Sequence, residues 1–367
     1  MEASLSRWEA GISVRIRTIS LICLALIGAP ALEGTAAAQE HRAIHLFSRV
    51  GDFDLGASVS RMDYESVDPK ARRLYISKMG GGQLLVFDLE HDKLAAQLDG
   101  FPKVTGVLVV PELHRVYASV PGGGVLASFS VGLGMAGLSS GNGEVAIRDT
   151  ETLKELARVP AGVFPDGIAY DPREHRVFVS DELGSAVTII DASADKSVAR
   201  IETGGEVGNV RYDPTSGEVF VPIQSRNELA RIDAVKASVV TRYQLAGCEH
   251  PHGLIVAPKG GVGYVACDKN DQLVTVNLAT GHILNEQPVA HDPDVLATDP
   301  GENRLYVAGE SGILSTYNIV TPDKPELLGN IFIARYAHTV AVDPVSHRLY
   351  FALAELSGRA VLRVMVP

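Results

Sequence analysis

The side chains that could carry chemistry recur at one position of a repeat, six residues before each of seven prolines. The residues at this position are Asp63, Thr105, Asp166, Gly208, His252, Asp294 and His338. Together, histidines and carboxylates can bind a divalent metal: histidine suits zinc or copper, and carboxylate suits magnesium, calcium or manganese. We therefore take His252, His338 and Asp294 as candidate metal ligands. If the protein is an enzyme, His252 or His338 is the natural general acid or base.

Three further polar residues adjoin this set. His250 and Asp292 each lie two residues before a member, and Asn209 follows Gly208 directly. They complete our candidate ligand-binding residues, which are Asp63, Asp166, Asn209, His250, His252, Asp292, Asp294 and His338.

The cysteines Cys248 and Cys267 flank the same histidines. Together with His250, His252 and Asp268 they leave three interpretations open, namely a disulfide, two separate thiols and a Cys/His metal site. The third is the weakest interpretation, because no C-x-x-C or H-x-x-x-H spacing supports it.

Several partners and cofactors are not expected. No C-x-x-C-H motif is present, so covalent haem is not expected. The formal G-x-G-x-x-G at residues 132–137 has no predicted helix after it and no βαβ unit around it, so we expect no nucleotide site. The net charge of −11, without a cluster of Lys or Arg, argues against nucleic acid as a partner.

The elements that position these residues come from an internal repeat. Its prolines are 42 to 44 residues apart, except for one gap of 61, and lie at Pro69, Pro111, Pro172, Pro214, Pro258, Pro300 and Pro344. An aromatic residue follows each proline by six positions, at Tyr75, Tyr117, Phe178, Phe220, Tyr264, Tyr306 and Tyr350. Five repeats also place an arginine four residues after the proline. Because aromatics are only 6% of the chain, this register is not chance.

Each repeat predicts four short strands rich in Val, Ile, Tyr and Phe, as in 167–170, 176–180, 186–191 and 197–202. No stretch shows a helical apolar period, so α-helix should be nearly absent. Seven four-stranded units predict an all-β, seven-bladed β-propeller. The consensus of Asp-Pro, then Arg-Leu-Tyr-Val, then Val-x-Val-x-Asp resembles the YVTN-repeat (YncE-like) propeller family. Quinoprotein dehydrogenases are also propellers, but their blades carry Trp-docking motifs that this chain lacks, so PQQ is not expected.

The ring should close through its N-terminal strand. The last repeat supplies three strands, and residues 44–53 resemble the missing fourth, which would remove two exposed edges from blade seven. The long gap places an insertion in blade two, at about residues 121–143, between its second and third strands.

The N-terminal residues predict export. Arg7, Arg15 and Arg17 precede a short apolar run, and Ala36–Ala38 follow it, which is typical of a secretory signal peptide spanning residues 1–38. Residues 39–367 would form the mature propeller, periplasmic or secreted, and not membrane-spanning.

Because first strands line the channel of a propeller, the recurring polar residues should form a ring at its mouth, beneath the insertion. Three interpretations of this ring are open: a solvated channel, a site for a small molecule or protein partner, and a catalytic or metal centre. We expect a binding or scaffolding module, with a metal-assisted lactonase or lyase as the alternative.

Overall fold

The computed structural model describes residues 46–122 and 142–367. The predicted signal peptide, residues 1–38, lies outside the described residues. The same is true of most of the predicted insertion, residues 123–141.

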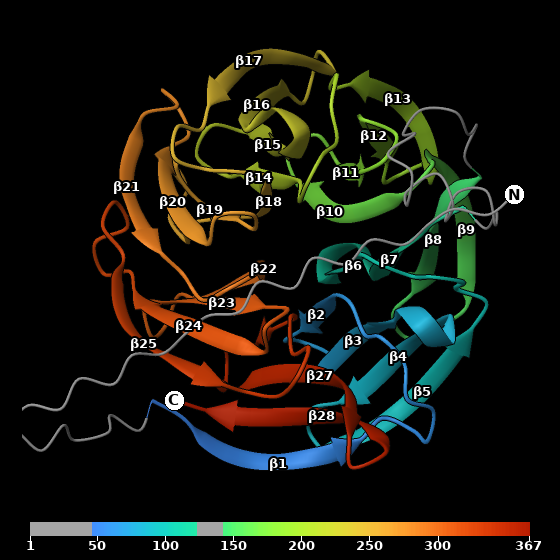
Figure 1. Cartoon of the computed structure of the whole chain (residues 1–367). Coiled ribbons are helices and arrows are strands. Elements are labelled where there is room, and N and C mark those ends of the chain that lie inside the picture. The colour runs from blue at the N-terminus through green and yellow to red at the C-terminus, as the bar shows by residue number, and fades with distance from the viewer. Residues whose placement is uncertain (1–45, 123–141) are drawn as a thin grey trace, which may run out of the picture. The chain divides into compact units, whose positions relative to one another are not determined.

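The described residues form seven four-stranded antiparallel sheets arranged as blades around a centre (Figure 1). Blade one contains β2 (Glu65–Asp68), β3 (Arg73–Lys78), β4 (Gln83–Asp88) and β5 (Lys93–Asp99). Blade two contains β6 (Val107–Val110), β7 (Arg115–Val120), β8 (Gly143–Asp149) and β9 (Glu155–Gly162). Blade three contains β10 (Pro165–Asp171), β11 (Arg176–Asp181), β12 (Ala186–Asp191) and β13 (Lys196–Glu202). Blade four contains β14 (Arg211–Asp213), β15 (Glu218–Ile223), β16 (Glu228–Asp233) and β17 (Ser238–Gln244).

Blade five contains β18 (Pro251–Val256), β19 (Val262–Cys267), β20 (Gln272–Asn277) and β21 (Ile283–Pro288). Blade six contains β22 (Pro293–Asp299), β23 (Arg304–Gly309), β24 (Ile313–Asn318) and β25 (Glu326–Phe332). Blade seven contains β26 (Ala341–Val342), β27 (Leu349–Leu356), β28 (Arg359–Val366) and β1 (Ser48–Asp54). The helical segments of the described chain are three 3-10 turns, η1 (Met79–Gly81), η2 (Pro111–Leu113) and η3 (Gln224–Arg226). Within these residues no helix is long and apolar enough to cross a membrane.

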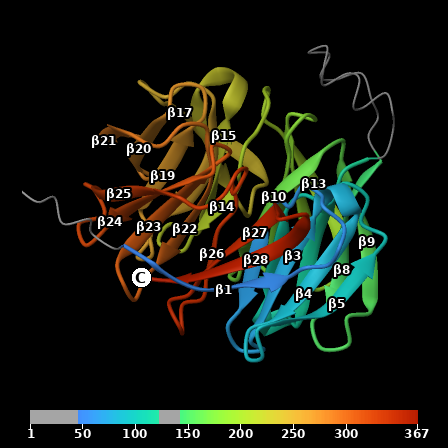
Figure 2. The ribbon, with the colours of Figure 1, turned by 60° about the horizontal axis from the view of Figure 1, so that its bottom comes forward.

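Closure of the ring by the N-terminal strand is confirmed. Strand β1 pairs with β28 from Ser48 opposite Val366 to Asp54 opposite Val361, and it lies along the outer side of β28 (Figures 1 and 2). Arg363 of β28 donates two hydrogen bonds of 2.8 Å to the Asp52 carboxylate of β1. The first and last segments of the propeller are thus joined in one sheet, which leaves blade seven with four strands like the others.

The repeated residues have identifiable roles in each blade. Every aromatic six residues after a repeated proline is fully buried, so this position supplies the large core side chain of the second strand. The Asp-Pro turns are closed by the aspartate, whose side chain accepts backbone N–H groups two and three residues on. Asp68 Oδ1, for example, accepts from Lys70 and Ala71 at 3.0 and 2.9 Å.

The recurring arginine joins neighbouring blades. Arg115 of blade two donates to Asp195 of blade three at 3.1 Å, and Arg348 of blade seven contacts Asp92 of blade one at 3.1 Å. Arg73 and Arg176 reach backbone carbonyls of the next blade in the same way. The repeat therefore encodes contacts between blades as well as the strands within them.

Near the centre the first strands pack closely. A Cβ atom added at Gly106 would lie 1.9 Å from the carbonyl oxygen of Asp166 on the next blade, so only glycine fits there. The close approach of these first strands brings the polar residues at their starts together around one opening.

Candidate functional site at the channel mouth

A cavity of about 630 Å³ at the channel mouth is lined mainly by residues from three positions of the repeat. Each such position, counted from the repeated proline, is called a register here. The register six residues before the proline contributes Asp63, Thr105, Asp166, His252 and Asp294. The register eight residues before it contributes Arg61, Phe164, His250, Asp292 and Tyr336. The register ten residues after it contributes Met79, Glu182, Gln224, Asp268 and Glu310. In an antiparallel blade the start of the first strand and the end of the second lie at the same edge, so these registers converge.

The predicted ligand-binding residues are all at or beside this cavity. Six of the eight line it, the exceptions being Asn209 and His338. Asn209 accepts a hydrogen bond of 2.7 Å from the hydroxyl of the lining residue Tyr64. His338 lies 2.7 Å from the lining residue Asp294.

Asp294 lies between two histidines from neighbouring blades. Its Oδ2 is 2.7 Å from His338 Nδ1, and its Oδ1 is 3.3 Å from His252 Nε2. Burial alone would raise the pKa of Asp294, but the hydrogen bonds from both histidines hold it well below its ordinary value. Asp294 is therefore an ionised carboxylate that bridges two imidazole rings.

Both rings have their second nitrogen occupied as well. His338 Nε2 faces the carbonyl oxygen of Met62 at 3.1 Å, and a carbonyl can only accept. His252 Nδ1 faces Oε1 of Gln224 at 3.2 Å. The amide of Gln224 donates to Val207 O and to Glu182 Oε1, so its oxygen is free to accept from the ring.

The two histidines are therefore cationic. Burial lowers the pKa of each ring, but the hydrogen bond to Asp294 and the surrounding negative charge raise the pKa of His252 to about 10 and that of His338 to about 9. An imidazolium whose two N–H groups both donate has no lone pair with which to accept a proton or to bind a metal.

Three carboxyl groups near these two cations have raised pKa values, so they ionise less readily than usual. Burial, with the nearby charge of Asp166, raises the pKa of Asp63 to about 8. Burial also raises the pKa of Asp166, and it raises the pKa of Glu182 to about 7. Asp63 is nine-tenths buried, with 10% of its side chain exposed, and its nearest cation is Arg61 at 3.8 Å. Among the described residues, no hydrogen-bond donor reaches its carboxyl group.

Arg61 and Glu310 form the rim of the cavity. Arg61 is 2.7 Å from Glu310 Oε1, and the same oxygen is 3.8 Å from His338 Nδ1. Asp294, Glu310 and His338 each present one donor atom within 4.8 Å of the other two, which is the spacing of a metal site. The structure thus brings together two of the three predicted metal ligands with Glu310, while His252 faces the other carboxylate oxygen of Asp294 and is not part of this cluster.

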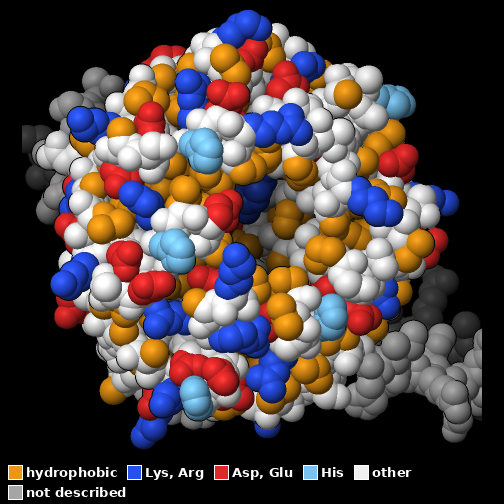
Figure 3. Space-filling model, turned by 180° about the vertical axis from the view of Figure 1, so that it is seen from behind, with side chains coloured by type: hydrophobic (Ala, Val, Ile, Leu, Met, Phe, Trp, Pro, Cys, Tyr) orange, Lys and Arg blue, Asp and Glu red, His pale blue; other side chains and the backbone are white. Residues whose placement is uncertain are grey.

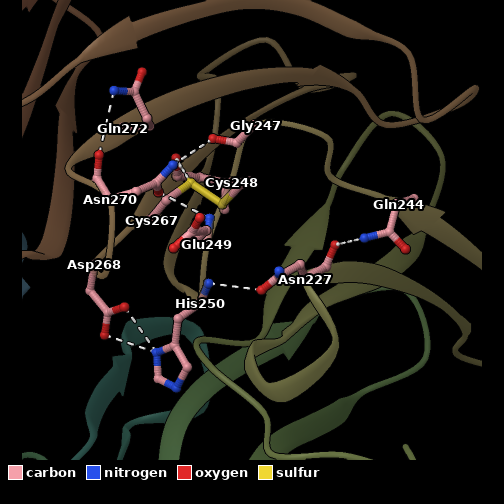
Figure 4. Close-up of a disulfide and its surroundings, with 11 residues drawn as sticks. Asn227, Gln244, Gly247, Cys248, Glu249, His250, Cys267, Asp268, Asn270 and Gln272 are labelled. Atoms are coloured by element: carbon pink, nitrogen blue, oxygen red, sulfur yellow. Dashed lines mark hydrogen bonds and ion pairs between the residues drawn. A yellow bond between two sulfur atoms is a disulfide. The ribbon is translucent and has the colours of Figure 1, made fainter.

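In blade five, a disulfide links Cys248 to Cys267 beside the mouth cavity, and their Cα atoms are 5.3 Å apart (Figure 4). The cysteines adjoin His250 and Asp268, which form an ion pair of 2.9 Å at the mouth. The hydrogen bond to Asp268 raises the pKa of His250 to about 9. The disulfide thus ties the segment that carries His250 to the end of β19, which precedes Asp268.

Sequence reasoning missed most of the third register. Glu182, Gln224 and Glu310 line the mouth, yet none of them was predicted. A signal was available, because all lie ten residues after a repeated proline, as does Asp268. Arg61 and Tyr336 share the register of His250 and Asp292, and this too could have been recognised.

Comparisons with known proteins identify the fold only. No family model matches the chain, and no curated protein matches it. Hydrazine synthase of Kuenenia stuttgartiensis is similar in structure, with a TM-score of 0.67 and 16% identity, covering 84% of this chain and 98% of that one. A chain in a crystal structure of the mitotic checkpoint complex has a TM-score of 0.70 and 12% identity, covering 96% of this chain and 99% of that one.

Proposed function

We propose that this chain is a ligand-binding β-propeller, without catalysis, and that its channel mouth takes a small organic amine or ammonium compound. The observation that carries this proposal is Asp63. It is a nine-tenths buried carboxyl group that faces the cavity and receives no hydrogen bond from the described protein. Burial keeps this carboxyl group mainly protonated, and a cationic ligand beside it would favour loss of the proton and form an ion pair with the carboxylate.

The charges around Asp63 favour a cation over an anion. Of the residues that line the mouth, seven carry a carboxyl group, whereas three carry a basic side chain. Two of these basic groups, Arg61 and His250, are already paired with Glu310 and Asp268. Asp63, Asp166 and Glu182 would ionise more readily beside a bound cation and less readily beside an anion, because a nearby positive charge lowers the pKa of a buried carboxyl group.

The aromatic residues at the mouth suit an ammonium group with an apolar body. Phe164 and Tyr336 line the cavity, and an aromatic face attracts a cation. Arg61 and Tyr336 also line an adjoining cavity of about 930 Å³, whose walls include Phe332 and Leu356. A ligand with its ammonium group near Asp63 could extend its apolar part into this second cavity.

A second candidate is the metal-assisted lactonase or lyase, which the cluster of Asp294, Glu310 and His338 favours. These residues are the right types to hold a divalent ion that polarises a substrate oxygen. The observed hydrogen bonds count against it, because both nitrogens of His338 already face acceptors. A metal would have to displace the proton that bonds to Asp294.

A thermal-shift and calorimetric screen tests the two candidates. The probes are phenethylamine and tetramethylammonium, with benzoate as the anionic control and Zn²⁺, Mn²⁺ and Ca²⁺ as the metal arm. A ligand at 100 times its Kd stabilises the fold by about 2.7 kcal/mol. We expect the amines to bind wild type and the surface control Glu326→Gln, and to lose at least tenfold in affinity in Asp63→Asn.

Two results would overturn the amine proposal. One is amine binding that is equal in wild type and Asp63→Asn. The other is the absence of amine binding together with metal binding that disappears in His338→Gln, which would favour the metal-assisted enzyme.

Export and family membership are part of the same proposal. The disulfide at blade five supports an oxidising compartment, because such bonds rarely persist in the cytoplasm. The repeat consensus supports a YVTN-like propeller. The resemblance in fold to a chain of the mitotic checkpoint complex is compatible with a protein partner as the alternative occupant of the channel face.

A further inference from the structure

The other half of the channel is a separate cavity of different character. It has a volume of about 540 Å³, and the first strands of all seven blades line it. Seen from behind, the ring is hollowed at its centre, with both hydrophobic and charged side chains around the hollow (Figure 3). Tyr64 lines both this cavity and the mouth, and its hydroxyl group bonds to Asn209 at 2.7 Å and to Asp166 at 3.3 Å. Tyr64 therefore lies between the two cavities.

We call this cavity of about 540 Å³ the lower cavity. It is unusual in the side chains that one register of the repeat contributes to it. Three residues before each repeated proline, six blades place a small or apolar side chain and blade four places Arg211. The six are Ser66, Leu108, Ala169, Ile255, Ala297 and Ala341, and all seven positions line the cavity. A single guanidinium thus projects from a ring of mostly apolar neighbours.

Arg211 is poorly paired. Of its five side-chain N–H donors, one is accounted for by a bond of 2.8 Å from Nη1 to the carbonyl oxygen of Val210. Within the described residues, no protein acceptor reaches the others. Burial lowers the pKa of Arg211, yet an arginine side chain stays protonated in proteins. The nearest acids do not form an ion pair with it, since Asp166 bonds instead to Tyr64.

Glu65, whose carboxyl group is the acid among the lining residues of this cavity, does not neutralise Arg211 either. Burial raises the pKa of Glu65 to about 8, so its carboxyl group is mainly protonated at neutral pH. Its Oε1 accepts the backbone N–H of Ala352 at 2.5 Å, and its Oε2 is buried without a partner. The lower cavity therefore carries one net positive charge on otherwise uncharged, largely apolar walls.

We propose that the lower cavity is a second binding site, for a small hydrophobic carboxylate whose carboxyl group pairs with Arg211. A planar guanidinium can donate two parallel hydrogen bonds to a carboxylate. The apolar walls, including Leu108, Ile255 and Ile168, would cover the hydrocarbon part. A volume of about 540 Å³ is in the range of small-molecule sites. This site is independent of the amine site, because it lies beyond Tyr64 and has the opposite charge.

Isothermal titration calorimetry on the mature protein tests this site, with octanoate and benzoate as probes and octan-1-ol as the uncharged analogue. We expect octanoate to bind at least tenfold more tightly than octan-1-ol. Arg211→Gln should abolish this preference, whereas Arg359→Gln, an exposed arginine on β28, should keep it. Ala297→Trp fills the cavity without altering Arg211, so it should weaken both octanoate and benzoate at least tenfold.

Binding of octanoate that is unchanged in both Arg211→Gln and Ala297→Trp would overturn the proposal, as would equal affinity for octan-1-ol. If Arg211→Gln does not fold, the comparison of octanoate with octan-1-ol and the Ala297→Trp variant decide the matter on folded protein. Asp63→Asn should leave octanoate binding unchanged, so the failure of one site is distinguishable from the failure of the other.

Discussion

The buried carboxyl group of Asp63 makes the stability of this propeller depend on pH in a defined direction. In the folded protein its pKa is raised from 3.8 to about 8 by burial and by the charge of Asp166. Between these two values the folded protein retains a proton that the unfolded chain has lost. Stability must therefore fall as pH rises from about 4 to about 8, by about 1.4 kcal/mol per pH unit for one proton.

Asp63→Asn removes this titration while keeping the size of the side chain. The free energy of unfolding of the variant should rise relative to wild type by about 4 kcal/mol between pH 5 and pH 8. Any effect of the asparagine amide on stability that does not depend on pH is the same at both pH values, so it drops out of this comparison. At roughly 2 °C per kcal/mol for a domain of this size, the relative Tm should rise by about 8 °C over the same interval.

The assay is chemical unfolding of wild type and variant at pH 5, 6, 7 and 8, in the absence of ligand and with the disulfide kept oxidised. Glu326→Gln, which removes an exposed carboxylate on β25, is the matched control and should give a difference that is constant with pH. A difference for Asp63→Asn that is also constant, or that shrinks as pH rises, would refute the assignment of Asp63 as a buried protonated acid.

Three further predictions follow from the fold and the site. Deleting residues 39–53 removes most of β1, so the Tm should fall by more than about 5 °C; a melting curve within about 1 °C of the full mature chain would contradict closure through β1. Thiol labelling of denatured, unreduced mature protein should label neither Cys248 nor Cys267, and replacing both by serine should lower the free energy of unfolding by about 3 kcal/mol. His250→Gln should destabilise the protein by about 2 kcal/mol below pH 6.5, and the loss should disappear as pH rises through about 9, because the pKa of His250 is raised to about 9; a loss that grows with pH would contradict this.

The repeat in the sequence was sufficient to predict the fold. Proline, arginine and aromatic positions recur at one spacing because each blade has to bury the same core side chain and make the same turn. The identity of the closing strand could be predicted for a related reason, since three strands at one end require a fourth from the other. These features are local or periodic, so they are recorded directly in the order of residues.

The sequence also predicted that the residues six positions before each proline would gather at the mouth, because equal registers of a propeller repeat lie at equal heights around the channel. It did not predict how they pair. That Asp294 bridges His252 and His338, so that both rings are cationic, depends on side-chain distances between neighbouring blades. The contact between Tyr64 and Asn209 joins residues 145 positions apart.

For the cysteines and for the lower cavity, too, the sequence left open what the structure shows. Cys248 and Cys267 left three interpretations open, and the pairing of β18 with β19, with Pro251 opposite Cys267, brings the two sulfur atoms together. Arg211 is an ordinary arginine in the sequence and becomes distinctive only when the ring surrounds it with apolar neighbours. The blades, their number and their order can all be read from the repeat. Which charges are paired, and which are left facing a cavity, is settled by the folded ring, because pairing depends on distances across the ring that no local pattern encodes.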